Sequence, residues 1–169
     1  MKRQIRIEGE IAFVPLTLGY EAVIDAEDVP LISAWIWCAS VSRRRDGSIR
    51  TVYALRNVHK VGSVHMHRVI AGTPPELHTD HIDGDGLNNR RSNLRVVTRS
   101  QNMRNRSVSA ASASGIKGVW WHKRDRKWYA TIRMEGKKHH LGCFSSIEKA
   151  AEAYAAASKS LHGEFGRTS

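Results

Sequence analysis

Residues 80–95 read DHIDGDGLNNRRSNLR, and this stretch decides the local fold on which the other predictions depend. Asp80 and His81 are neighbours, so an extended strand would turn their side chains to opposite faces unless the chain bends there. The glycines of the run 83–86 can supply the positive φ angles that such a bend requires. Residues 94–97 form a short apolar strand that can pair with the strand leading into Asp80, and a helix carrying Asn102 follows. The pattern predicts strand, loop, strand and helix.

The same stretch gathers a carboxylate, an imidazole and several carboxamides between arginines. Counting from His81, Asn93 follows after 12 residues and Asn102 after 21. These residues and this spacing resemble the HNH endonucleases, specifically the zinc-free phage and intron homing enzymes with a ββα-metal site. The resemblance implies an enzyme that hydrolyses a DNA phosphodiester to 3′-hydroxyl and 5′-phosphate ends.

The resemblance also implies a role for each of the four positions, and the chemistry of the side chains supports those roles. Asp80 and Asn102 offer hard oxygen ligands for one Mg²⁺ or Mn²⁺ ion. His81 titrates near neutrality and is the expected general base. The carbonyl of Asn93 is expected to accept a hydrogen bond from the imidazole and so fix its tautomer. Three arginines beside the motif are candidate phosphate contacts: Arg90, Arg91 and Arg95.

Two simpler interpretations of the motif are less favoured. Asp, Gly and Asn are common in ordinary turns, but a turn alone does not explain Asn93 and Asn102. A calcium loop is disfavoured because no glutamate closes it at the twelfth position.

The positive charge is concentrated in one segment. The chain carries 27 Lys and Arg against 16 Asp and Glu, a net charge of +11, and residues 90–140 hold 14 of the basic residues with only two acidic ones. Such a segment is typical of a protein that binds a polyanion. A membrane surface would favour a basic amphipathic helix, whereas this segment is predicted to form strands. We therefore expect double-stranded DNA as the partner and no membrane.

Cysteine usage and the apolar runs set further limits. Cys38 and Cys143 form no CxxC pair, so no structural zinc is expected. The chain starts Met1-Lys2-Arg3 without the apolar run of a signal peptide, and stretches such as 34–39 are too short to span a bilayer. We expect a cytoplasmic protein of a bacterial or phage-infected cell, and not a secreted one.

The first part of the chain, residues 1–106, is predicted to be the nuclease region. Strands and a hairpin fill residues 1–63, and the ββα-metal core occupies residues 64–106. Asp25 is predicted to cap a short helix. Trp35, Trp37 and Tyr53 are expected to pack the core of a hairpin whose Arg43–Arg45 turn is either a phosphate contact or a solvated loop.

Histidines precede the motif. His67 is expected to support the site or pack beside it rather than bind metal. The role of His78 is left open.

Residues 107–114 are predicted to be a flexible basic and Ser/Ala-rich linker. From residue 115 the pattern changes to three short strands followed by one amphipathic helix. Alternation along the middle strand places Trp128, Ala130 and Ile132 on the face that meets the helix and Thr131 and Arg133 on the other. A three-stranded antiparallel sheet packed on one helix is the predicted fold, so the whole chain is expected to be α+β.

This second region resembles the plant APETALA2/ethylene-response-factor (AP2/ERF) DNA-binding domain. The segments SGIKGVWW, KWYATIRMEGKKHHLGCF and EKAAEAYAAASKSLHGEF carry the resemblance. Trp120 stands where that family usually has arginine, and His140 where it usually has tryptophan. The resemblance implies a sheet face that enters the major groove, with these DNA-facing residues: Lys117, Trp120, Arg124, Lys127, Thr131, Arg133, Lys138 and His140. Arg133 is the leading candidate for reading a base. A sheet that only neutralises phosphates is the alternative.

The overall prediction is a site-directed DNA endonuclease of the HNH homing type. One active site per chain predicts a monomer that nicks one strand, with a dimer needed for a double-strand break. The alternatives are a sequence-specific regulator with an inactive nuclease motif and a nonspecific defence or phage nuclease.

Overall fold

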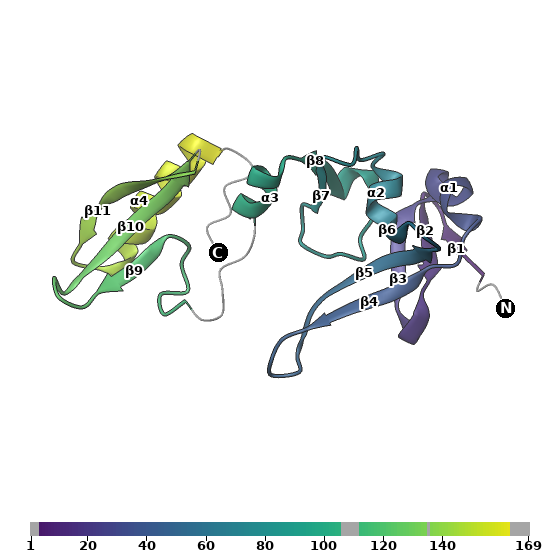
Figure 1. Ribbon diagram of the computed structural model, residues 1–169, viewed down its shortest axis with the longest axis horizontal. Helices are drawn as coiled ribbons and strands as arrows, with labels where there is room; N and C mark the ends of the chain where they lie inside the picture. Colours follow the sequence, from purple (N-terminus) through teal and green to yellow (C-terminus); the bar gives the residue numbers. More distant parts are fainter. Residues whose placement is uncertain (1–3, 106–111, 135, 163–169) are drawn as a thin grey trace. The chain divides into compact units, whose positions relative to one another are not determined.

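The computed structural model describes residues 4–105, 112–134 and 136–162 (Figure 1). The chain divides into two compact units, residues 1–99 and 100–169. Helices and small antiparallel sheets occur in both, so the fold is mixed α+β, as predicted. Most of the predicted linker, residues 107–111, lies outside the described residues. Ser114 already belongs to the second unit, because its Oγ donates to the carbonyls of Ile116 (3.0 Å) or Val119 (2.6 Å).

Two three-stranded sheets and two short helices of the first unit share one hydrophobic core. The first sheet joins β1 (Arg6–Glu8), β2 (Ile11–Pro15) and β3 (Glu21–Asp25), with the 3-10 turn η1 (Thr17–Gly19) between β2 and β3. The second joins β4 (Cys38–Arg43), β5 (Ile49–Val58) and β6 (Gly62–His65). Between the sheets come the 3-10 turn η2 (Ala26–Asp28) and helix α1 (Val29–Ser33), and α2 (Met66–Ile70) follows β6. The fully buried side chains include Leu16, Ile24, Ile32, Trp37, Met66 and Ile70.

The motif itself forms a small hairpin beside this core. Strand β7 (His78–His81) pairs antiparallel with β8 (Leu94–Val97), and the 3-10 turn η3 (Arg91–Asn93) leads into β8. Helix α3 (Arg99–Asn105) follows directly. The order strand, loop, strand and helix is the one that the sequence predicts.

The long loop between β7 and η3, residues 82–90, is docked on the first sheet. The backbone N–H of Val23 in β3 donates to the carbonyl of Leu87 (2.9 Å), and the N–H of Asn89 donates to the carbonyl of Val23 (2.7 Å). Strand β3 therefore holds this loop in place.

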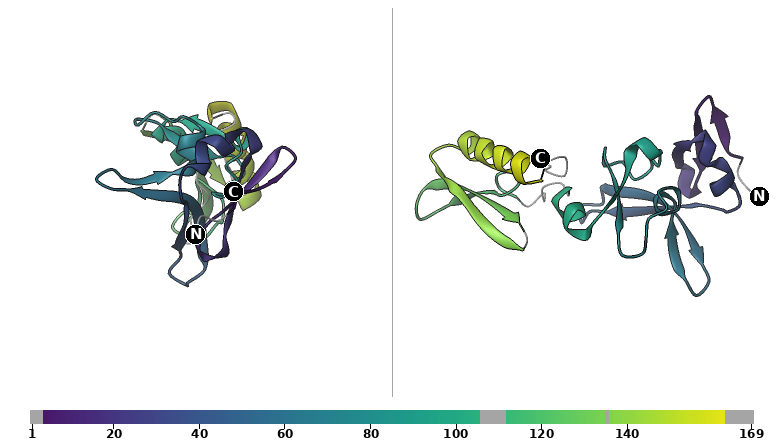
Figure 2. Two further views of the ribbon diagram at one scale, coloured as in Figure 1. Left: turned by 90° about the vertical axis from the view of Figure 1, so that its right-hand side faces the viewer. Right: turned by 90° about the horizontal axis from the view of Figure 1, so that it is seen from above.

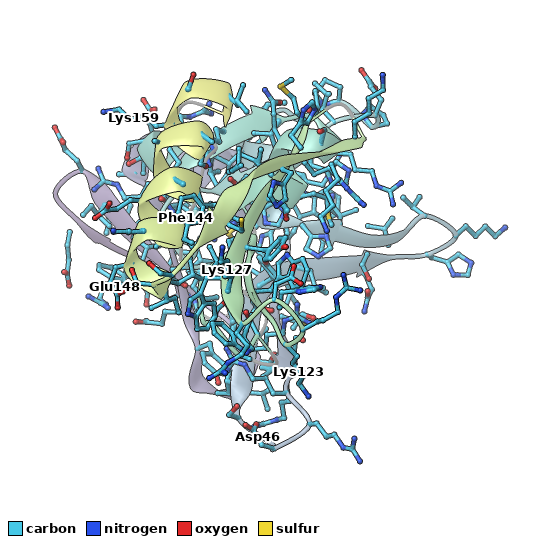
Figure 3. The ribbon with its side chains drawn as sticks, turned by 90° about the vertical axis from the view of Figure 1, so that its left-hand side faces the viewer. Asp46, Lys123, Lys127, Phe144, Glu148 and Lys159 are labelled. Atoms are coloured by element: carbon cyan, nitrogen blue, oxygen red, sulfur yellow. The ribbon has the colours of Figure 1, made fainter. Side chains whose placement is uncertain are left out.

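The second unit is a sheet covered by one helix. Strands β9 (Val119–His122), β10 (Lys127–Met134) and β11 (Lys137–Phe144) lie in the order β11-β10-β9, and α4 (Ile147–His162) packs on them. Val119, Ala130, Ile132, Ala150 and Tyr154 form its core. Figure 3 shows α4 crossing the sheet, with Glu148 and Lys159 on the helix and Lys127 on a strand. Among the described residues, none of the helices is both long and apolar enough to cross a membrane.

Candidate functional site

The predicted general base, His81, is held by Asn89. His81 ends β7 and is 5% exposed, and its Nε2 lies 3.2 Å from the side-chain oxygen of the fully buried Asn89. The amide nitrogen of Asn89 donates to the carbonyl of Leu87 (3.0 Å), which turns the Asn89 oxygen toward His81. An oxygen can only accept, so Nε2 must carry the proton. In the neutral imidazole the lone pair is then on Nδ1.

The second ring nitrogen of His81, Nδ1, is not engaged by a hydrogen bond within the described residues. It is not among the buried polar atoms that lack a partner. Burial lowers the pKa of His81, although the hydrogen bond to Asn89 and the charges of Asp83, Asp80 and Asp85 act to raise it. The imidazole is thus neutral and presents an accessible lone pair near pH 7, which is the state that a general base needs.

Asn93 does not hold the imidazole, contrary to our prediction. Its side-chain oxygen accepts from the backbone N–H of Asp83 (3.0 Å), and its amide nitrogen donates to Asp83 Oδ1 (2.9 Å) or to the carbonyl of Asn88 (2.8 Å). Asn93 is buried and joins Asp83 to Asn88 through its hydrogen bonds, while Asn89 takes the place beside His81. The sequence offers three asparagines in this loop, and spacing alone does not show which one faces inward.

The two glycines of the loop serve different purposes, and only one of them as predicted. Gly84 has a φ of +83° and absorbs the bend. Gly86 has no positive φ, and glycine is required there because a side chain has no room. A Cβ at Gly86 would lie 2.4 Å from the carbonyl oxygen of Val52 and 2.5 Å from the ring of Tyr53. The loop therefore rests directly on strand β5.

Asp80, the predicted metal ligand, is paired with a cross-strand arginine. Asp80 faces Arg95 across the β7–β8 hairpin, and its Oδ2 accepts from Arg95 Nε (3.0 Å) and Nη2 (2.8 Å). Both side chains are largely buried, at 13% and 14% exposure. Arg95 thus orients a carboxylate, and this position corrects our prediction of a phosphate contact.

The oxygen chemistry of the predicted ligands suits a hard divalent ion. Carboxylate and carboxamide oxygens are both normal ligands for Mg²⁺. In the described ranges no three His, Cys, Asp or Glu side chains gather as a metal site. An ion at Asp80 would therefore need carboxamide and water ligands as well. Asn102 is half-buried on α3, within the second unit, and its place in this ligand set stays a prediction.

Arg90 and Arg91 are also bound to carboxylates of the first unit, and their role as phosphate contacts stays a prediction. Asp25 accepts from Arg90 Nε (2.7 Å) and from the backbone N–H of Arg91 (2.8 Å), and it makes no capping hydrogen bond at its own helix. The Arg91 side chain binds Asp28, whose carboxylate is only 3% exposed, at 2.6 and 3.1 Å. Burial raises the pKa of Asp25, but the hydrogen bonds from Arg90 and Arg91 outweigh it and the pKa is lowered. These bonds fasten the end of the loop to the first sheet.

A cluster of aromatic rings backs the imidazole. The ring centroid of His67 lies 4.9 Å from that of His81 in an edge-to-face arrangement, and Tyr53 lies 5.8 Å from His81 and 5.6 Å from His67. His67 is 8% exposed, its Nδ1 is buried without a partner, and burial above all lowers its pKa to about 3. A neutral, enclosed His67 packs against the base, in line with its predicted supporting role. His78 is half-buried at the start of β7.

Only one of the three aromatic residues expected in the hairpin core is there. Trp37 is 2% exposed and donates to the carbonyl of Ile32 (3.0 Å). Trp35 is 51% exposed and stacks under the Arg56 guanidinium (3.9 Å), and Tyr53 belongs to the His81 cluster. Tyr53 of β5 thus faces the motif and not a core within the hairpin.

In the second unit, strand register places most of the predicted DNA-facing residues on one face of the sheet. Directly opposed residues share a face, and the pairs are Thr131 with His140, Arg133 with Lys138, and Trp120 with Tyr129. Lys127 shares this face through its pair with His122. Ala130 and Ile132 are buried on the other face beneath α4.

On this face the predicted DNA-facing Trp120 and His140 form one aromatic group with Tyr129 and His122. The ring of Tyr129 lies 5.0 Å from Trp120, 4.9 Å from His122 and 5.2 Å from His140, and Lys138 Nζ lies 5.5 Å from the Trp120 ring. Arg124, with a 93% exposed side chain, lies in the β9–β10 turn at the edge of the face. Lys117 precedes β9 and is half-buried. The outward face of the sheet is therefore both aromatic and basic.

Comparison with known proteins gives an independent indication of the chemistry. A family model described as HNH endonuclease matches residues 64–104. Protein 3.8 of Escherichia phage T7 is 35% identical over 94 residues, which cover 56% of this chain and 77% of that protein. An uncharacterized HNH endonuclease of Acanthamoeba polyphaga mimivirus is 31% identical over 113 residues, covering 63% of this chain and 58% of that protein. No solved structure matches the chain.

Proposed function

Because this chain belongs to the HNH endonuclease family and is a DNA endonuclease, we propose that it is a site-directed enzyme of the homing type. It nicks one strand of double-stranded DNA and leaves 3′-hydroxyl and 5′-phosphate ends. The observation that carries this proposal is the orientation of His81, whose protonated Nε2 is fixed on Asn89 and whose Nδ1 is open.

In this proposal His81 Nδ1 takes a proton from the water that attacks the phosphorus. Removing that proton makes the water a stronger nucleophile at the moment of attack. Asn89 stabilises the resulting imidazolium, because its oxygen accepts a stronger hydrogen bond from Nε2–H once the ring is charged. Tyr53 and His67 exclude water from the back of the ring and leave Nδ1 as the site of proton transfer.

A divalent metal ion, on which HNH nucleases generally depend, is proposed to bind Asp80 and Asn102. When bound, it supplies positive charge that stabilises the leaving 3′ oxygen. Arg95 holds the Asp80 carboxylate in one orientation before the ion arrives. Asn102 enters this set through the family resemblance.

The second unit is proposed to be an AP2/ERF-type module that binds DNA through the face carrying Arg133. Basic side chains can meet phosphates, and Arg133 can bond two acceptors of a guanine at once. The exposed aromatic group around Tyr129 and Trp120 offers apolar contact to thymine methyl groups or sugars.

Nicking of supercoiled plasmid in the presence of Mg²⁺ tests the nuclease part. The natural chain should convert supercoiled DNA to open circles, and DNA ligase should reseal them without pretreatment because the ends are 3′-hydroxyl and 5′-phosphate. His81→Ala should bind DNA without cutting it, while His78→Ala, three residues earlier on β7, serves as the matched control. Equal nicking by the natural chain and His81→Ala would refute the assignment of the base.

Equilibrium binding to duplex DNA tests the second unit. Arg133→Gln should weaken binding and reduce the preference for the target over random sequence. Lys159→Gln removes the same charge from the exposed surface of α4 and is the control. A uniform loss of affinity on every sequence would instead favour phosphate neutralisation without base reading.

We place this activity in the cytoplasm of a bacterial or phage-infected cell, with one chain cutting one strand. Nicked circles should accumulate before linear DNA at limiting protein concentration. Linear DNA as the first product would show that two active sites act together.

A further inference from the structure

The turn between β4 and β5 carries arginines that make no ion pair within the described residues. Arg43, Arg44, Arg45 and Arg50 are all exposed, and among the described residues none of them lies within ion-pair distance of an acidic side chain. The one acidic residue of the turn is Asp46, and its carboxylate accepts from the N–H (2.9 Å) and Oγ (2.6 Å) of Ser48. The arginines beside the motif differ, because Arg90, Arg91 and Arg95 are all bound to carboxylates.

The turn that presents these arginines is well ordered by its own hydrogen bonds. The backbone N–H of Arg44 donates to the carbonyl of Ser48 (2.8 Å). The backbone N–H of Gly47, a residue with a φ of +82°, donates to the carbonyl of Arg44 (3.0 Å). Arg43 Nη1 donates to the carbonyl of Gly47 (3.1 Å), and Arg44 Nη1 donates to the carbonyl of Ile49 (2.8 Å). Arg45 and Arg50 make no hydrogen bond within the described chain. The two are free to bind an external anion.

The hairpin has the shape of a groove-binding ribbon. β6 pairs only with the Leu55–Val58 end of β5, so the part of β5 nearer the turn has β4 as its sole strand partner in the described sheets. Every residue from 42 to 50 is exposed. Figures 1 and 2 show this two-stranded ribbon standing out from the first unit, and Figure 3 marks Asp46 at its tip. The major groove of B-DNA admits a two-stranded β-ribbon of this kind.

The ribbon starts beneath the active-site loop. Val52 and Tyr53 lie on β5 and contact Gly86 and His81, and Tyr53 comes four residues after Ile49, where β5 begins at the turn. At about 3.3 Å per residue, Arg50 lies roughly 10 Å along the strand from Tyr53, and Arg45 in the turn roughly 15–20 Å. One turn of B-DNA is about 35 Å long and holds 10 to 10.5 base pairs, so these separations are about three to five base pairs.

We propose that the β4–β5 hairpin is a second DNA-contacting arm, which places Arg45 and Arg50 on the duplex about three to five base pairs to one side of the cleaved phosphate. The predicted spacing between the arginine contacts and the cleaved phosphate rests on the proposed role of His81, but the contact of the arm with DNA does not. The arm fixes the duplex relative to His81 from within the first unit, separately from the second unit's sheet.

Binding measured in the His81→Ala background tests the arm without any cleavage. Each phosphate contact contributes about 0.9 to the slope of log affinity against log salt. Arg45→Gln should lower that slope by about one, and Arg45→Gln/Arg50→Gln by about two, with roughly eightfold weaker binding per arginine at 0.1 M salt. Arg45→Lys should keep the slope because it keeps the charge. The exposed Lys60, in the β5–β6 turn, gives the matched control Lys60→Gln, which should leave the slope unchanged.

Hydroxyl-radical footprinting around the mapped nick then locates the contact. The His81→Ala protein should protect the backbone about three to five base pairs to one side of the nick, and the double arginine variant should lose only that protection. An unchanged slope and footprint in the double variant would overturn the arm, even if the natural chain nicks DNA as proposed. A protein ligand of acidic character would be indicated if the double variant lost binding to an acidic polypeptide but kept its full affinity and salt slope for DNA.

Discussion

Replacing His67 with phenylalanine tests whether a neutral histidine is enclosed behind the base. His67 is 8% exposed and its pKa is lowered to about 3 by burial first, then by His81, His65 and Arg68. Phenylalanine keeps a planar ring but cannot take a proton. We expect His67→Phe to fold, and to lose less stability than the natural chain when the pH falls.

The magnitude follows from proton linkage. The folded-state pKa lies below the unfolded value of 6.5, so the unfolded chain binds the extra proton between those values. The stabilising contribution is therefore complete above pH 6.5 and is lost as the pH falls toward 3. The slope is about 1.4 kcal/mol per pH unit, which amounts to about 2 kcal/mol between pH 7.5 and pH 5.0.

Urea titrations at pH 7.5 and 5.0, read by a hydrogen-exchange pulse on peptides from β5 and α2, measure the first unit alone. The free energy of unfolding of His67→Phe minus that of the natural chain should increase by about 2 kcal/mol at the lower pH. His59→Phe changes an exposed histidine of the same unit and should not alter the acid dependence. If His67→Phe and the natural chain lose the same stability, His67 is not held neutral and the packing argument fails.

Three further predictions concern the loop that holds the base. Asn89→Asp should raise the apparent pKa of the acid limb of the kcat/KM profile by about one pH unit or more, because a carboxylate beside Nε2 favours the protonated imidazole. An unchanged acid limb would show that residue 89 does not bond to the base. Gly86→Ala should cost about 1–3 kcal/mol in urea unfolding, because its Cβ meets the Val52 carbonyl. Arg91→Ala should lower the melting temperature by leaving the buried Asp28 carboxylate without its ion pair, and Asp28→Asn in the same chain should restore part of the loss.

Local patterns predicted the elements well. The alternation of Trp128, Ala130 and Ile132 with Thr131 and Arg133 appears as two faces of β10, because strand geometry depends only on neighbouring residues. The order of elements around His81 followed in the same way from glycines, apolar runs and the spacing of the motif.

The partners of charged and carboxamide side chains were not predictable in this way. Arg90 and Arg91 find Asp25 and Asp28, which are more than 60 residues away in the chain. A basic run in the sequence therefore overstated the positive charge that is available to DNA. The choice of Asn89 over Asn93 likewise depends on the backbone bonds of the loop to Val23, which no local pattern reveals.

Residues 1–63 are best understood as the frame of the active site. The family model matches residues 64–104, yet of the ten buried residues in the core of the first unit only Met66 and Ile70 come from that stretch. Strand β3 and η2 hold the loop at Val23, Asp25 and Asp28, and β5 supports it beneath Gly86. The same β5 strand begins at the arginine-rich turn, so the proposed DNA arm and the support beneath Gly86 belong to one strand. The frame thus connects the place where we propose the duplex is held with the place where it is cut.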